Sequence, residues 1–172
     1  MNSIWRKRLY AVGVLAFMGM VVLLAGQRAA LGEEERGGAR KLHGTWDVIL
    51  LFPVCSPLCA CPGGVPNIPI PALHTYSSDG SILEAGGGLL FRGPGLGSWE
   101  YVGNRQFESR FKFFIFKPDG TRRGSEVVTN HITLTGSDSF QANATFDLFD
   151  PAGNVIAQGC PINETAKRFD DD

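Results

Sequence analysis

The stretch from Gln106 to Gln158 constrains the fold most, because apolar and polar residues alternate over two long runs within it. The apolar members of these runs are Phe107, Phe111, Phe113 and Ile115, then Phe140, Ala142, Ala144, Phe146 and Leu148. A period of two predicts β-strands with one buried and one solvated face. Turn signals at 117–120, 135–139 and 150–154 separate the strands, so we expect consecutive strands to be antiparallel neighbours.

Short alternating segments elsewhere supply the remaining strands, which we predict at 44–52, 72–76, 81–85, 96–102, 122–135 and 154–162. Together with the two long runs they make eight strands in sequential order. A sheet of eight meandering strands removes its exposed edges by closing. We therefore predict an all-β protein, an eight-stranded antiparallel up-and-down barrel over residues 43–169. Such a barrel is filled by side chains or holds one small ligand.

The first 32 residues have the pattern of an export signal. The basic residues Arg6, Lys7 and Arg8 precede an uncharged apolar run at 9–24, and small residues at 30–32 fit a signal peptidase site. The apolar run is also near the shortest length that spans a bilayer, so an uncleaved membrane anchor is the alternative. We expect a periplasmic or extracellular protein with a flexible mature N-terminus at 33–42 and an acidic tail at 170–172.

The remaining chain of about 140 residues corresponds to one domain. Removing the leader, which has four basic and no acidic residues, takes the formal net charge from −1 to −5. A mildly acidic domain argues against nucleic acid and against an anionic membrane surface as partners. We expect no stable membrane contact after cleavage, and the oligomeric state stays open.

All four cysteines, Cys55, Cys59, Cys61 and Cys160, follow the leader, and export makes disulfides the expectation. Cys59 and Cys61 are too close in sequence to pair comfortably. Two pairings remain: Cys55–Cys59 with Cys61–Cys160, or Cys55–Cys61 with Cys59–Cys160. Both tie the first long loop to the last strand. The rival interpretation is a zinc site, but the C-x3-C-x-C spacing is unusual for one and we assign no metal.

Gly44-Thr45-Trp46 on the first strand resembles the G-x-W motif of the calycins, which include lipocalins and avidin-like barrels. The resemblance implies that Trp46 closes one end of the barrel beneath Arg168 near the last strand. Three further segments (T-Y-x-x-D-G at 75–80, G-x-G-x-W-x-x-x-G at 95–103 and F-x-P-D-G at 116–120) are similar to bacterial barrels related to allene oxide cyclase. That resemblance implies cyclisation or isomerisation of apolar substrates in some members.

The predicted lumen is rich in aromatic side chains, and we expect a ligand there to contact Trp99, Tyr101, Phe107, Ser109, Phe111, Phe113, Asn130, Ala142, Ala144 and Phe146. The two alanines either open a cavity or let large rings interdigitate in a filled core. Glu126 also has inward parity, but its place early in a strand predicts contact with solvent. The face of His74 is ambiguous, and the other carboxylates are predicted to point mostly outward.

Three functions follow as hypotheses. The first is binding of an apolar or aromatic small molecule in the lumen, with no cofactor. The second is a cofactor-independent cyclase or isomerase, for which Glu84, Tyr101 and Asn130 are the catalytic candidates. The third is a protease inhibitor or interaction module that uses the 33–42 tail. The sequence shows no nucleophile–base–acid set and no phosphate-binding glycine loop.

Overall fold

We describe the fold from a computed structural model of the chain, in which residues 38–39, 41–53, 55–56, 59, 64–86 and 91–169 are described. The predicted export signal, the acidic tail, Cys61 and most of the 33–42 tail lie outside these residues. Leu42, at the end of that tail, is fully buried in the core of the barrel. Within the described ranges, no helix is both long enough and apolar enough to cross a membrane.

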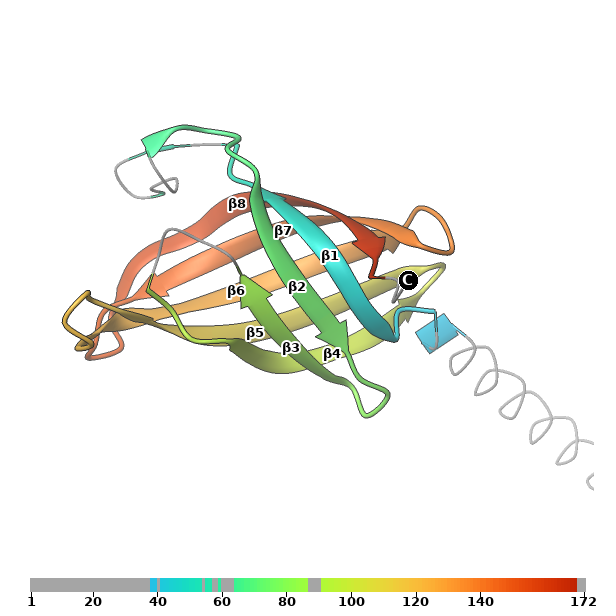
Figure 1. The fold of residues 1–172 in the computed structure, drawn as a ribbon, viewed down its shortest axis with the longest axis horizontal. Helices are drawn as coiled ribbons and strands as arrows, with labels where there is room; N and C mark the ends of the chain where they lie inside the picture. The colour runs from blue at the N-terminus through green and yellow to red at the C-terminus, as the bar shows by residue number, and fades with distance from the viewer. Residues whose placement is uncertain are drawn as a thin grey trace, which may run out of the picture. The chain divides into compact units, whose positions relative to one another are not determined.

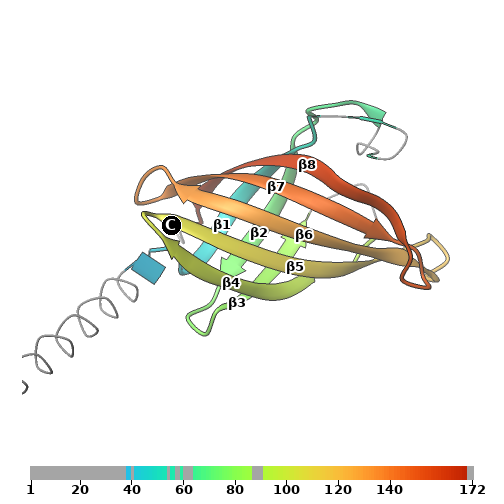
Figure 2. The same cartoon turned by 180° about the vertical axis from the view of Figure 1, so that it is seen from behind.

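Eight antiparallel strands form a closed barrel in which each strand pairs with its sequence neighbours and β8 closes onto β1, as predicted. The strands are β1 (Gly44–Leu51), β2 (Ile70–Tyr76), β3 (Ser81–Gly86), β4 (Gly95–Gly103), β5 (Gln106–Phe116), β6 (Arg122–Leu134), β7 (Ser139–Phe149) and β8 (Val155–Arg168). Figure 1 shows β1, β2 and β3 on one side of the barrel, and Figure 2 shows the longer strands β5 to β8 from the opposite side.

The predicted turns join the strands in the expected way. In three of them a glycine (Gly80, Gly120 or Gly153) adopts a positive φ between 82° and 92°, a conformation that side chains disfavour. An aspartate in each turn accepts a backbone hydrogen bond, as when Asp119 accepts from the Thr121 N–H at 2.9 Å. These local interactions set the register of the long hairpins.

The eighth strand differs from its prediction, because it runs six residues beyond Ile162 to Arg168. Pro161 lies within it and pairs with Thr145 of β7. The ladder to β1 begins only at Asn163, so a proline before that point interrupts no pairing on the β1 side. The polar segment after Ile162 is therefore part of the strand. Buried and exposed residues alternate along it, and Glu164 is one of the buried residues inside the barrel.

One end of the barrel, here called the Trp46 end, contains the start of β1, the end of β8 and the turns after β2, β4 and β6. The guanidinium carbon of Arg168 lies 4.3 Å from the centroid of the Trp46 ring, the contact that the G-x-W resemblance implies. Arg168 also donates to the backbone carbonyls of His43 (2.7 Å) and Lys41 (2.9 Å), and Trp46 donates to that of Leu42 (2.9 Å). These bonds hold residues 41–43 across the Trp46 end.

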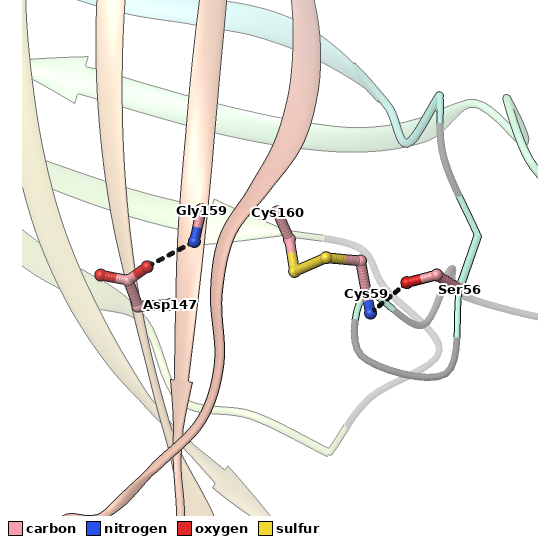
Figure 3. The surroundings of a disulfide bond; sticks show 5 residues. All are labelled: Ser56, Cys59, Asp147, Gly159 and Cys160. Atoms are coloured by element: carbon pink, nitrogen blue, oxygen red, sulfur yellow. Dashed lines mark hydrogen bonds between the residues drawn. A yellow bond between two sulfur atoms is a disulfide. The ribbon is translucent and has the colours of Figure 1, made fainter.

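The opposite end, here called the disulfide end, contains the connections after β1, β3, β5 and β7. Cys59 in the β1–β2 connection forms a disulfide with Cys160 on β8, 101 residues away (Figure 3). This bond belongs to the second of the two predicted pairings, and it uses two of the thiols that the zinc alternative requires. Cys61, the partner that this pairing gives to Cys55, lies outside the described residues.

Candidate functional site

The lumen contains a chain of polar side chains among its aromatic rings. Eight of them come from six different segments: His74 and Tyr76 on β2, Glu84 on β3, Arg92 before β4, Ser109 on β5, Glu126 and Asn130 on β6, and Glu164 on β8. Strand parity directs the seven strand residues inward together with the aromatic residues, and Arg92 enters from the β3–β4 connection. An eight-stranded barrel ordinarily fills its interior with apolar side chains, so this concentration of polar groups marks a candidate site.

An ion pair occupies the part of the lumen beneath the β3–β4 connection. Arg92 donates from Nη1 to Glu84 Oε2 at 2.6 Å and from Nη2 to Glu84 Oε1, which is a two-point contact. The guanidinium carbon also lies 4.1 Å from the centroid of the Phe113 ring. The Arg92 backbone forms a β-bridge with Ile115, and its side chain is nearly buried.

Two glycines make room for this ion pair. A Cβ atom at Gly95 would lie 2.8 Å from Glu84 Oε2 and 2.7 Å from the Phe111 ring, both closer than ordinary contacts. A Cβ atom at Gly86 would lie 2.8 Å from Glu84 Oε1 and would overlap the Arg92 guanidinium. The glycines at the end of β3 and the start of β4 thus serve the packing of charged side chains.

The second group of polar residues surrounds the Tyr76 hydroxyl. Tyr76 Oη lies 3.3 Å from His74 Nδ1, within hydrogen-bonding distance. Burial raises the pKa of Tyr76 well above 10, and the negative charge of Glu164 adds to this rise. The Ser109 hydroxyl is close enough to lower the same pKa, although it makes no hydrogen bond of ordinary distance and angle. The Tyr76 hydroxyl therefore lies near polar groups from β2, β5 and β8.

Asn130 lies beside this group on β6. It is fully buried and is the cross-strand partner of Ser109 on one side and of Ala144 on the other. Ala142, the next inward residue on β7, is the cross-strand partner of Glu164. Two small side chains on β7 therefore separate the amide of Asn130 from the carboxyl of Glu164.

Six buried polar atoms of this region have no hydrogen-bond partner among the described residues: His74 Nε2, Ser109 Oγ, both amide atoms of Asn130 and both carboxyl oxygens of Glu164. Leaving a buried donor or acceptor unpaired costs about 1–3 kcal/mol. Six such atoms would cost on the order of 10 kcal/mol, as much as the whole stability of many domains. Ordered water or a bound molecule in the lumen would remove this cost by pairing with these atoms.

Burial also sets the charge of the lumen. It raises the pKa of Glu164 to about 8, with the nearby Glu84 charge acting in the same direction. It raises the pKa of Glu126 to about 8 as well, against the opposing effect of Arg92. It lowers the pKa of His74 to about 3, helped by the positive charge of Arg92. At neutral pH both carboxyls are thus mostly protonated, and His74 is neutral.

The predicted site residues form two groups along the barrel. Trp99, Tyr101 and Phe107 lie at the Trp46 end: Trp99 donates to Ser77 O at 3.0 Å, and the ring centroids of Tyr101 and Phe107 are 5.2 Å apart. Tyr101 is only partly buried and lies apart from the polar group. The other predicted contacts lie inward along the barrel, and all are buried: Ser109, Phe111, Phe113, Asn130, Ala142, Ala144 and Phe146.

The prediction that Glu126 contacts solvent was wrong: it is 7% exposed, because β6 extends four residues before it and β5 and β7 cover it there. The described carboxylates do point mostly outward, as predicted, but Glu84, Glu126 and Glu164 are buried within the lumen. His74 and Tyr76, whose face was ambiguous, point inward as well.

The fold and the site define a closed antiparallel barrel with a polar group inside an aromatic lumen. The sequence matches no protein-family model and no curated protein sequence. Among the residues with a described position, no three His, Cys, Asp or Glu side chains come together in a way that would hold a metal ion.

Proposed function

We propose that this barrel binds a small, largely apolar molecule in its lumen and orients it through a polar group. The observation that carries the proposal is the set of six unpartnered, buried polar atoms on His74, Ser109, Asn130 and Glu164. Aromatic rings provide apolar contact on both sides of this set, with Phe111 beside His74 at 5.6 Å and Phe146 beside Phe52 at 5.7 Å between ring centroids.

The small residues on β7 support the same proposal. Ala142 and Ala144 point into the lumen from β7, the strand between those that carry Asn130 and Glu164. A ligand beside these alanines can therefore contact polar groups of β6 and β8 together. Burying about 200 Å² of apolar ligand surface contributes about 5 kcal/mol at 25 cal/mol per Å². The polar contacts then determine orientation and selectivity.

Titration of the purified, oxidised protein with an uncharged, environment-sensitive dye tests the proposal. We expect saturable binding with a rise in dye emission. Phe111→Ala should weaken binding about tenfold because it removes a lumen contact. Phe114→Ala is the matched control, since Phe114 lies on the same strand but is 46% exposed on the outer face. Absence of saturable binding by the wild-type protein would refute the proposal.

Ala144→Phe provides a second variant that fills the lumen instead of emptying it. We expect it to abolish dye binding while the protein keeps its thermal unfolding transition. Unchanged dye binding by Ala144→Phe would show that the dye binds elsewhere on the protein.

The second candidate function is that of an enzyme that rearranges its ligand, and the properties of Glu164 favour this function. A carboxyl whose pKa lies near the working pH, beside a Tyr–His pair, has the properties of a general acid. Chromatography of a ligand recovered after incubation with the protein separates the two candidates. Conversion that is lost in Glu164→Gln supports catalysis, and recovery of unchanged ligand supports binding alone.

A further inference from the structure

We infer that the polar group of the bound molecule is an uncharged oxygen, such as that of a ketone, aldehyde, ester or epoxide, and that Glu164 and Asn130 donate hydrogen bonds to it. This inference rests on the proposed function, because it names the chemical class of the lumen ligand.

A carboxylate ligand finds no available cation among the lumen side chains described here. Arg92 is the cation in the polar group, and both of its terminal nitrogens already donate to the two oxygens of Glu84. Phe113 packs against the same guanidinium. Releasing Arg92 to a ligand would leave the Glu84 carboxylate buried and unpaired, which is strongly unfavourable.

An ammonium ligand would require an ionised partner. Glu164 is a buried carboxyl without a partner among the described residues, and the groups around it oppose its ionisation. Glu84 on β3 is a second negative charge, Tyr76 on β2 is a neutral phenol, and the cross-strand partners of Glu164 are Leu50 on β1 and Ala142 on β7. A cation would thus have to lose its hydration and ionise a buried acid at the same time.

An uncharged oxygen avoids both costs. The protonated carboxyl of Glu164 has one O–H donor, and the Asn130 amide has two N–H donors; neither group has a partner among the described residues. A carbonyl oxygen has two lone pairs that accept from two such donors. Ser109, the cross-strand partner of Asn130, adds a hydroxyl donor on the neighbouring strand.

Four probes on one naphthalene frame test the inference by displacement of the uncharged dye: 2-acetylnaphthalene, 2-naphthoate, 2-naphthylmethylammonium and 2-ethylnaphthalene. We expect the ketone to bind at least about tenfold more tightly than either ion and than the hydrocarbon. Glu164→Leu should remove the preference for the ketone over the hydrocarbon. Because this preference is a ratio within one variant, a partial loss of folded protein does not alter it.

The pH dependence of ketone binding identifies the donor. Binding by the wild-type protein should weaken as the pH rises from 7 through 9, because Glu164 loses the proton that it donates. Glu164→Gln keeps a neutral donor, so its affinity should stay within about threefold of wild type and be constant over this range. Glu126→Gln is the matched control: its carboxyl also has a pKa of about 8, but it is the cross-strand partner of Phe113 and Leu148, and the pH dependence should remain.

Tighter binding of the ammonium or the carboxylate probe would overturn this inference and leave the proposed function standing. A ketone preference that survives in Glu164→Leu would overturn it as well. If neither the dye nor any of the four probes binds, the proposed function itself is refuted and this inference is refuted with it.

Discussion

Arg92 and Glu84 form a two-point ion pair inside the barrel, with both side chains removed from water. Removing one partner of such a pair leaves an uncompensated buried charge, so we expect Arg92→Met to lower the free energy of unfolding by about 3–5 kcal/mol. The double variant Arg92→Met/Glu84→Gln should be less destabilised than the sum of the single variants. Urea denaturation of all four proteins measures this coupling, and additive effects would contradict a direct pair.

The space for this pair depends on the absence of a side chain at Gly95. A methyl group there would press on Glu84 and on the Phe111 ring, so Gly95→Ala should cost about 1–3 kcal/mol by overpacking. Gly93→Ala is the matched control, because no atom lies within 4 Å of a Cβ at that position. Equal thermal unfolding midpoints for the two variants would argue against the packing described.

Stability should depend on pH through the buried carboxyls. The pKa of Glu126 and of Glu164 is about 8 in the folded protein and 4.5 for an ordinary glutamate. Between these values the unfolded chain releases protons that the folded chain keeps, so the free energy of unfolding should fall as the pH rises from about 4.5 to about 8. His74, whose pKa is lowered from 6.5 to about 3, acts oppositely, and its contribution is lost as the pH falls from 6.5.

Above about pH 6.5 the effect of the carboxyls should therefore dominate. Urea denaturation between pH 6.5 and 8 should show a decline for the wild-type protein and a smaller one for Glu126→Gln/Glu164→Gln. Glu100→Gln, at an exposed position of β4, should behave like wild type. A wild-type stability that rises over this range would contradict the assigned protonation states.

Arg168 should stabilise the Trp46 end through its fixed geometry more than through its charge. It stacks on Trp46 and donates to two carbonyls of residues 41–43, so Arg168→Ala should cost about 2 kcal/mol. Arg168→Lys should recover less than half of this loss, because an ammonium cannot make the same contacts together. Arg110→Ala, at an exposed position of β5, should change the thermal unfolding midpoint little, and a similar loss there would indicate a general effect of charge.

The disulfide between Cys59 and Cys160 should stabilise the barrel by restricting the unfolded chain. It joins residues 101 apart, and native disulfides of this kind contribute about 2–4 kcal/mol. Cys59→Ser/Cys160→Ser should therefore unfold at a lower denaturant concentration than wild type in non-reducing buffer. An unchanged midpoint would show that the β1–β2 connection is held to β8 by other contacts.

The strands could be predicted from the sequence because apolar and polar residues alternate in the two runs that begin at Phe107 and Phe140. A period of two is typical of a strand with one buried face and is incompatible with a helix. The Trp46–Arg168 contact followed from the resemblance of Gly44-Thr45-Trp46 to the G-x-W motif of the calycins and not from the strand pattern, since the predicted eighth strand ended at Ile162. Boundaries were accurate where glycine and aspartate make turns. The end of β8 was not, because the residues after Ile162 are mostly polar.

The polar group in the lumen was only partly predictable. Asn130 and Ser109 follow from strand parity, whereas Glu164 was missed with the end of β8. Arg92 enters from a connection, where alternation carries no information about direction. His74 and Tyr76 lie on a short strand whose two faces differ little in polarity. The paired register of β2 with β1 and β3 decides which face is inward, and that register is a property of the fold.

A crystal structure of the oxidised protein grown with 2-acetylnaphthalene tests the central claim most directly. We predict the probe inside the barrel, with its oxygen within hydrogen-bonding distance of Glu164 or Asn130 and its rings against Phe111. A lumen in which Ser109, Asn130 and Glu164 pair with one another or with ordered water alone, with the probe absent or on the outer surface, would contradict the claim.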